Sequence, residues 1–212
     1  MFIVRIEPEQ RIQKELEYFK LNKDPSRPFD LAGNSMNDLT GKILGPAGTP
    51  YEGGKYQIRF LIPDNYPFSP PKVYFTTKIW HPNVSTVNGV VCMNILNNGW
   101  TTSTTLGIVM FSLRALMSAP ETDKLRDAGF VASQYKGDRE KFNKIAQYWA
   151  YKYAGGKSTN LNVASFDDLV KRVVAMGFSK DKAIKFLSQN SFDLQATVDK
   201  INKWRVPPKH QK

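Results

Sequence analysis

Apolar and polar residues alternate along KYQIRFLIP, residues 55–63, where every second position from Tyr56 to Ile62 is apolar. A period of two is typical of a β-strand with one buried face. Residues 38–44 (DLTGKIL) and 72–77 (KVYFTT) show a weaker strand pattern on either side of it. Since turns and no helical segment separate these runs, the sequence predicts an antiparallel meander.

Helical periodicity appears before and after this region. Within residues 9–21 the apolar positions recur at i, i+4 and i+7, and the segment ends before Pro25. Apolar faces of the same kind run along residues 106–117 and 142–153. The last of these stops at Gly155, a residue type that commonly ends helices. Strands in one block with helices around it predict an α+β fold.

A second unit follows a linker-like stretch, GGKSTNLNVA. Ser165 opens a capping-box pattern, an MGF motif breaks the helix behind it, and Ser179 can cap the next helix. A third apolar face lies near residues 194–201. Three short helices in about 40 residues are near the lower size limit of an independent domain.

The patterns therefore divide the chain into four parts. We expect an α+β domain over residues 1–154, a linker over residues 155–164, a three-helix domain over residues 165–204 and a tail over residues 205–212. The proline-rich block between the strands favours rigid turns there, since proline fixes its own backbone angle.

Composition narrows the function classes. The formal net charge of +11 is spread along the chain, with 20 Lys+Arg against 14 Asp+Glu in residues 1–159 and 10 against 5 in residues 160–212. No segment combines a basic cluster with stacking aromatic residues, so the charge suits acidic protein partners and does not predict specific nucleic-acid binding. One cysteine and two histidines exclude a disulfide framework and make a metal site unexpected.

The lack of a recognisable targeting signal favours an intracellular protein. The apolar run at the N-terminus, FIV with its flanking methionine, is too short for a secretory signal. No later run could span a bilayer, so we expect no membrane association and a location in the cytoplasm, the nucleus or both. The GGKST motif at residues 155–159 lacks the earlier glycine of a phosphate-binding loop and follows a helix, so neither ATP nor another cofactor is predicted.

The segment HPNVSTVNGVVCMNIL carries the candidate chemistry. Cys92 lies among apolar residues, which suits a core position, but it also follows the turn signal Asn88-Gly89. His81 could act as a base for the thiol, or it could fix a turn, because the proline after it favours an extended backbone. Asn83 could direct an amide N–H at an oxyanion.

The motif YPFSPPKVYFTTKIWHPN, followed nine residues later by Cys92 and eight residues after that by Trp100, closely resembles the ubiquitin-conjugating enzymes. The resemblance runs from the first helix to about Ala154 and implies their fold, a four-stranded antiparallel meander flanked by helices. The final unit, with MGF between its first two helices, resembles a ubiquitin-associated domain. This order of modules, and the spacing from Asn83 to the cysteine, suit the subgroup with a C-terminal ubiquitin-associated extension.

The resemblance implies a transferase mechanism. Cys92 would accept ubiquitin from the activating enzyme as a thioester and pass it to lysine amines, building polyubiquitin chains. Asn83 would donate to the tetrahedral oxyanion or brace the loop that does so, and both roles remain open. His81, Pro82 and Trp100 would structure the loops near the site. A thiol suits transthiolation as nucleophile and leaving group, and no histidine base, metal or cofactor is required.

Several residues depart from the family pattern. Relatives usually place an acidic or hydroxyl residue near the site to orient the incoming lysine; Lys124 stands at the matching position, so Asp123 takes that role or none does. Asn94 stands where many relatives have aspartate. After Trp100, TTSTT replaces the frequent Ser-Pro-Ala. Phe68 matches the family's ligase-contact aromatic residue, and ordinary loop packing is its alternative.

In the C-terminal unit, Met176, Gly177 and Phe178, together with Ile201, are expected to form the apolar patch that binds ubiquitin non-covalently. Relatives tend to have two leucines in the third helix, and Lys200 stands at one of these positions here. Phe178 could instead serve the core, and the unit could pack on the catalytic domain. If it binds ubiquitin, a short tether would hold ubiquitin at a local concentration of about the mM range.

The partners implied are ubiquitin, the ubiquitin-activating enzyme, ubiquitin ligases and protein substrates. The alternative is a non-catalytic adaptor that keeps the fold and binds ubiquitin or ligases without the chemistry. The presence of Cys92 and Asn83 favours the enzyme, whereas Asn94 and Lys124 keep the adaptor open.

Overall fold

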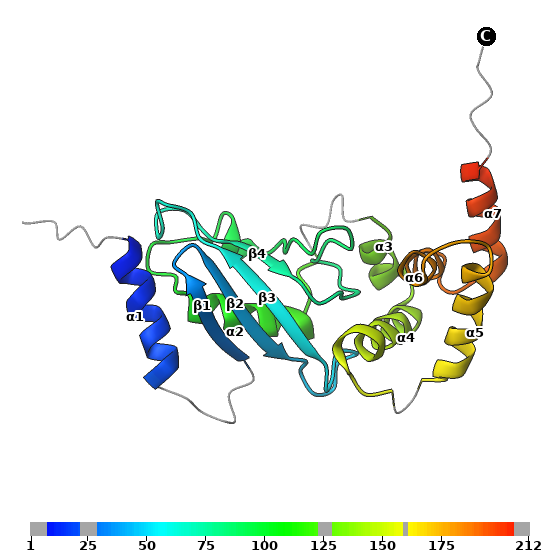
Figure 1. Ribbon diagram of the computed structural model, residues 1–212, viewed down its shortest axis with the longest axis horizontal. Helices are drawn as coiled ribbons and strands as arrows, with labels where there is room; N and C mark the ends of the chain where they lie inside the picture. The colour runs from blue at the N-terminus through cyan, green and yellow to red at the C-terminus, as the bar shows by residue number, and fades with distance from the viewer. Residues whose placement is uncertain (1–7, 22–28, 123–128, 159–160, 206–212) are drawn as a thin grey trace, which may run out of the picture.

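An antiparallel sheet forms the centre of the N-terminal part of the computed structural model, which describes residues 8–21, 29–122, 129–158 and 161–205 (Figure 1). Each strand pairs with the next along the chain, in the order β1-β2-β3-β4. The strands are β1 (Phe29–Ser35), β2 (Asp38–Leu44), β3 (Lys55–Leu61) and β4 (Lys72–Phe75). The mixture of helix and antiparallel sheet confirms the predicted α+β class.

One face of the sheet is buried, because successive side chains of a strand point to opposite faces. Leu39 and Ile43 of β2 and Tyr56, Ile58 and Phe60 of β3 are buried, whereas the residues between them face outward. The period of two in residues 55–63 therefore correctly identified the buried face of β3. In Figure 1 the helix α2 lies behind the sheet.

The helices of this part flank the sheet. They are α1 (Pro8–Leu21), α2 (Leu106–Ser118), α3 (Gly129–Gly137) and α4 (Arg139–Trp149), which continues into the π-helical turn η2 (Ala150–Ala154). The helix ends at Gly155, whose φ of 69° is the left-handed conformation that glycine adopts without strain. The predicted stop at this glycine is confirmed.

Two elements had no clear signal in the sequence. The strand β1 has the sequence FDLAGNS, without alternation, and its position is fixed by backbone pairing to β2. The helix α3 is short and bounded by Gly129 and Gly137, so its apolar face extends over little more than two turns. Both elements depend on tertiary pairing more than on their own pattern.

The C-terminal part contains the helices α5 (Val163–Val174), α6 (Lys180–Gln189) and α7 (Leu194–Arg205). The predicted capping box at Ser165 is wrong: the helix starts earlier, because the Asn162 side chain accepts from the Ser165 backbone N–H at 3.1 Å. Ser179 caps α6 as predicted, accepting from the Lys182 N–H at 3.4 Å.

The C-terminal helices pack against the sheet-containing part beside α3 and α4 (Figure 1). The Asp167 carboxylate accepts from the Tyr148 hydroxyl at 2.6 Å and the Lys152 ammonium at 2.7 Å. Asp181 in the same way accepts from the Tyr153 hydroxyl and from Lys78. Asp167 and Asp181 thus each contact one tyrosine and one lysine, and these bonds hold the pKa of both carboxyl groups below the usual value.

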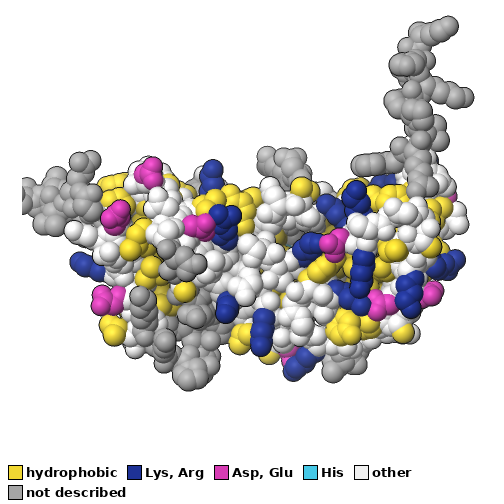
Figure 2. Space-filling view, in the orientation of Figure 1, with side chains coloured by type: hydrophobic (Ala, Val, Ile, Leu, Met, Phe, Trp, Pro, Cys, Tyr) yellow, Lys and Arg dark blue, Asp and Glu magenta, His cyan; other side chains and the backbone are white. Residues whose placement is uncertain are grey.

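Figure 2 shows basic side chains over the C-terminal helices, interspersed on this face with acidic and apolar ones. The net charge of +11 is therefore not gathered here into a surface of one sign.

Candidate active site

The turn His81–Asn83 is held by the imidazole of its first residue. His81 is 1% exposed; its Nδ1 accepts from the Asn83 backbone N–H at 3.0 Å, so Nε2 carries the proton and donates to the Leu116 carbonyl at 3.0 Å. Burial lowers the pKa of His81 to about 4, which keeps the ring neutral at neutral pH. Both ring nitrogens hold backbone groups, and Pro82 beside them is buried.

The side chain of Asn83 connects this turn to a distant loop. It is 3% exposed, its Oδ1 accepts from the Glu121 backbone N–H at 3.1 Å, and its Nδ2 donates to the Glu121 carbonyl at 2.9 Å. The Asn83 carbonyl also accepts from the Cys92 N–H at 2.8 Å. Asn83 therefore joins three backbone segments, and its amide dipole is oriented by both bonds to Glu121.

The thiol of Cys92 faces solvent. Val91 and Met93 on either side of it are buried, so the alternation of an extended backbone turns Cys92 outward. The segment is anchored to the sheet because the Val91 N–H donates to the Val73 carbonyl at 3.0 Å. The core position that composition favoured is wrong, since an exposed thiol fills no core.

The turn before the cysteine requires glycine. Gly89 has a φ of 73°, and a Cβ there would lie 2.0 Å from the Phe75 carbonyl oxygen. The Gly89 carbonyl accepts from the Phe75 N–H at 2.8 Å. The predicted turn at Asn88-Gly89 thus packs directly against the end of β4 and leads the chain toward Cys92.

No motif in the sequence points to Glu121 as part of the site. Its carboxylate accepts from the Asn94 backbone N–H at 2.8 Å, and Asn94 begins the short helix η1 (Asn94–Leu96) that follows Cys92. The same residue is held on its backbone by Asn83. The acidic residue predicted in this loop, Asp123, lies outside the described residues.

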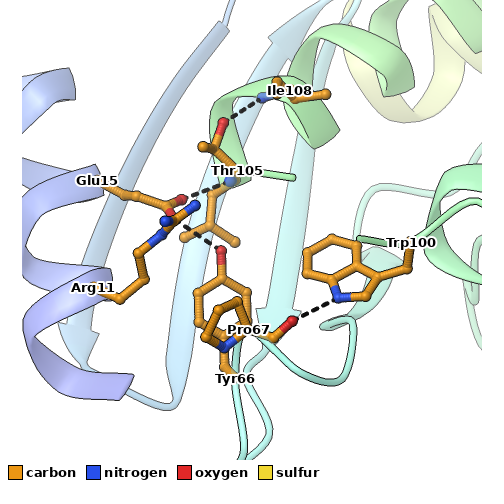
Figure 3. Close-up of polar contacts among 8 residues, drawn as sticks. Arg11, Glu15, Tyr66, Pro67, Trp100, Thr105 and Ile108 are labelled. Carbon is orange, nitrogen blue, oxygen red and sulfur yellow. Dashed lines mark hydrogen bonds and ion pairs between the residues drawn. The ribbon is translucent and has the colours of Figure 1, made fainter. Parts of the chain in front are cut away.

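Trp100 and Phe68 lie on neighbouring loops. The Trp100 indole N–H donates to the Pro67 carbonyl at 2.8 Å, and its ring centroid lies 6.0 Å from that of Tyr66 (Figure 3). The Phe68 side chain is 73% exposed. Its exposure argues against the loop-packing alternative, because a packed aromatic ring would be covered.

A buried carboxylate on α1 supports these loops (Figure 3). Glu15 accepts from the Tyr66 hydroxyl at 3.0 Å, from the Leu106 N–H at the start of α2 at 2.6 Å, and from the Arg11 guanidinium. A helix N-terminus and a guanidinium both stabilise a carboxylate. The sequence offered no signal for this role, because Glu15 occupies a helix position that is usually solvated.

The residues of the predicted ubiquitin-binding patch in the C-terminal unit differ in their exposure to solvent. Met176 and Phe178 are partly buried and Gly177 is exposed, with a φ of 92° that breaks the helix as predicted. Ile201 is 4% exposed, so it belongs to the core between the helices rather than to an open surface. A cavity of about 230 Å³ lies there, lined by Phe178, Phe186, Gln189, Asn190, Thr197, Lys200 and Ile201.

The described residues contain neither a cluster suited to a metal ion nor a helix able to span a membrane. Among residues 8–21, 29–122, 129–158 and 161–205, no three His, Cys, Asp or Glu side chains gather where they could bind a metal ion. Within the same ranges, every helix falls short of the length and apolar character needed to cross a membrane.

Comparison with known proteins places this site in a family. The family described as "Ubiquitin-conjugating enzyme" matches residues 11–150. "Ubiquitin-conjugating enzyme E2 K" of Homo sapiens is 40% identical over 193 residues, which cover 90% of this chain and 94% of that protein. "Ubiquitin-conjugating enzyme E2 27" of Arabidopsis thaliana is also 40% identical over 193 residues, covering 90% and 96%. Both alignments are longer than the family match and so extend beyond it.

Solved structures agree. The E2 domain of a Toxoplasma gondii ubiquitin-conjugating enzyme superimposes with a TM-score of 0.61 at 34% identity, covering 68% of this chain and 97% of that one. A putative ubiquitin-conjugating enzyme from Plasmodium yoelii gives a TM-score of 0.62 at 38% identity, covering 69% and 95%. The fold of the sheet-containing part is therefore that of these enzymes.

The depressed pKa of His81 makes stability depend on pH. Between pH about 6.5 and about 4 the unfolded chain binds a proton that the folded protein does not, so acidification favours unfolding. We expect the free energy of unfolding to fall by about 3 kcal/mol across this window and to be fully retained above it. Urea denaturation at several pH values measures the change. Protonation of Asp167 and Asp181 lowers the stability only at more acidic pH, because both carboxyl groups have reduced pKa values.

The matched control is His81→Gln, which lacks the titrating ring. Its stability at neutral pH should be lower, but the loss between pH about 6.5 and about 4 should be much smaller than in the wild type. Equal pH dependence in the two proteins would show that His81 is not the group responsible.

Proposed function

This chain belongs to the ubiquitin-conjugating enzyme family, and from that premise we propose that Cys92 is the residue that carries ubiquitin. The protein is a transferase of the ubiquitination pathway. The observation that supports Cys92 most directly is its exposure on a segment whose neighbours, Val91 and Met93, are buried. Such a thiol is accessible to two large partners in turn while its backbone stays fixed.

The proposed reaction has two steps. The Cys92 thiolate attacks the thioester carbonyl that joins ubiquitin to the activating enzyme, a tetrahedral intermediate forms, and the thiolate of the activating enzyme leaves. A neutral lysine amine then attacks the Cys92 thioester carbonyl, the Cys92 thiolate leaves, and the nitrogen gives up one proton to the departing thiolate or to water, so that an amide bond remains. Because a thiolate is a good leaving group, it departs without protonation by a general acid, and His81 keeps its structural bonds.

Asn83 acts in this proposal as a brace. Both of its bonds to Glu121 orient the amide, and its carbonyl holds the Cys92 N–H. It thereby fixes the Glu121 loop against the cysteine segment, where the Glu121 carboxylate holds the Asn94 N–H. The bracing role explains the observed geometry, whereas the oxyanion role uses an amide that is already engaged on both atoms.

The partners follow from the exposed surfaces. Phe68, exposed beside Trp100, is the proposed contact for a ubiquitin ligase. The C-terminal helices are proposed to be a ubiquitin-associated domain, with the partly buried Met176 and Phe178 on either side of the exposed Gly177 as the surface that binds ubiquitin. Non-covalent capture of ubiquitin beside a thioester-bearing cysteine supports the building of chains. An adaptor without chemistry would not need an accessible thiol next to an assembled brace.

Thioester formation tests the proposed role of Cys92. With activating enzyme, ATP and ubiquitin, the wild type should form an adduct that disappears on addition of thiol. Cys92→Ala should form none, and Cys92→Ser should form an oxygen ester that resists thiol, because an ester is less readily attacked by thiolate. Non-reducing and reducing gels report the result. A thiol-sensitive adduct in Cys92→Ala would disprove the proposal.

The brace can be separated from an oxyanion donor by two substitutions. Asn83→Ala should load ubiquitin normally but discharge it to free lysine about a hundredfold more slowly, because a displacement of about 1 Å can cost that much. Asn83→Asp keeps the acceptor for the Glu121 N–H and adds a negative charge. If Asn83 is a brace, Asn83→Asp should discharge ubiquitin faster than Asn83→Ala. If Asn83 is an oxyanion donor, the two variants should discharge ubiquitin equally slowly. Single-turnover assays of purified thioester decide between them.

The ubiquitin-binding surface is tested by Met176→Glu. A charge placed in the partly buried centre of an apolar contact should weaken binding of free ubiquitin about tenfold and leave thioester loading unchanged. Titration of isotope-labelled ubiquitin followed by NMR measures the affinity. Ala164→Glu is the matched control, since it adds the same charge at an exposed position near the start of α5. Equal affinities of the two variants would argue against this surface.

A further inference from the structure

Gln134 of α3 bridges the C-terminal helices and the residue before the catalytic turn. The Trp80 indole N–H donates to its Oε1 at 2.8 Å, and its Nε2 donates to the Ser188 carbonyl at 3.2 Å and the Ser191 hydroxyl at 2.9 Å. An indole N–H can only donate, so the amide orientation is determined by chemistry: the oxygen must face Trp80. Both hydrogens of the amide nitrogen are then directed at the end of α6.

A second indole is tied to the same end of α6. The Trp149 N–H donates to the Ser188 hydroxyl at 2.8 Å, and the Ser188 hydroxyl donates to the Ile184 carbonyl at 2.7 Å. The rings of Trp80 and Trp149 lie 5.1 Å apart. Trp80 and Ser188 are both 0% exposed, so these polar groups are sealed from water and need the partners they have.

Trp80 is also joined to the active-site turn. Its carbonyl accepts from the Tyr51 hydroxyl at 2.9 Å, and the next residue is His81. The His81 ring accepts from the Asn83 N–H, and the Asn83 carbonyl accepts from the Cys92 N–H. Every step from α6 to Cys92 is therefore a hydrogen bond or a peptide linkage, and Trp80, His81 and Asn83 on this path are buried, whereas Gln134 is partly buried.

We propose that Gln134 is a positioning residue through which the docked C-terminal unit stabilises the transfer-competent arrangement of the His81–Asn83 turn. When α6 is docked, both donors of the amide are used, and its oxygen is held toward Trp80. When α6 is displaced, the amide loses both partners and turns freely, which leaves the buried indole N–H without a fixed acceptor. The Trp80 ring, and with it the backbone into His81, then samples further conformations.

This inference rests on the proposed role of Cys92 and Asn83 and adds a contribution from outside the reaction centre. It assigns to the C-terminal unit an effect on the chemical step that does not depend on its binding of ubiquitin. Coupling of this kind is reciprocal in binding free energy, so a change in docking and a change in the turn should accompany each other.

Ser191→Ala tests the coupling from the far end, because it removes an acceptor of Gln134 without altering the sheet-containing part. In the full chain, loaded with ubiquitin, we expect discharge at saturating free lysine to slow by about threefold to tenfold, the range typical of residues that couple two sites. The lysine concentration at half saturation should not change. The Trp80 indole N–H, assigned in NMR spectra with Trp80→Phe, should exchange faster with solvent.

Three further variants sharpen the result. Ser179→Ala is the matched control: it removes a hydroxyl that caps α6 but does not contact Gln134, so discharge and Trp80 exchange should match the wild type. Gln134→Glu keeps an acceptor for Trp80 but cannot donate to the Ser188 carbonyl, and it should behave like Ser191→Ala. Gln134→Met lacks both functions at similar volume and should have the largest effect on Trp80 exchange.

The coupling is overturned if Ser191→Ala and Gln134→Glu discharge at the wild-type rate with unchanged Trp80 exchange, while Asn83→Ala discharges slowly. That result would leave the proposed function intact. Loading is measured first in every variant, so a failure of Cys92 to form a thioester in the wild type is recognised separately. If Gln134→Met does not fold, the test uses Ser191→Ala, its control Ser179→Ala and Gln134→Glu.

Discussion

The side-chain amide of Asn83 is the contact on which the geometry of the site depends. It pairs with both backbone groups of Glu121, and the backbone carbonyl of Asn83 accepts from the Cys92 N–H. Because the amide is buried, a lost partner costs about 1–3 kcal/mol of desolvation, which makes alternative arrangements of these loops unfavourable. A single residue thus holds three backbone segments in one arrangement, and the Cys92 thiol belongs to one of these segments.

The division of tasks around the thiol follows from burial. His81 is enclosed, neutral and bonded through both ring nitrogens, so it stabilises the turn and neither nitrogen is free to accept a proton from Cys92. Cys92 is exposed because its neighbours occupy the core. A rigid backbone beneath an accessible sulfur suits a residue that meets one protein as acceptor and another as donor, since both partners approach from solvent.

Local pattern predicted the elements whose side chains carry their own signal. The alternation in β3, the glycine at the end of α4 and the turn at Gly89 are all found where the sequence placed them. It did not predict β1 or α3, which are fixed by pairing and packing with distant segments. For the same reason Glu15, Glu121 and Gln134 had no signal: each is an ordinary polar residue on a helix or loop, and its partners are known only once the chain is folded.

The docked C-terminal helices change how a tethered ubiquitin-binding unit should be understood. With a free linker, the local concentration of captured ubiquitin is set by linker length. Here the unit is held by two carboxylates, Asp167 and Asp181, and by aromatic contacts of Tyr148 with Phe166 and Phe192 at 5.0 and 5.3 Å. The exposed ion pair at Asp181 contributes little, because water screens it, so the buried aromatic and indole contacts provide most of the docking energy. On the proposed function, a ubiquitin captured by this unit would be placed at a defined position relative to Cys92, and geometry rather than linker length would determine which of its lysines reach the thioester.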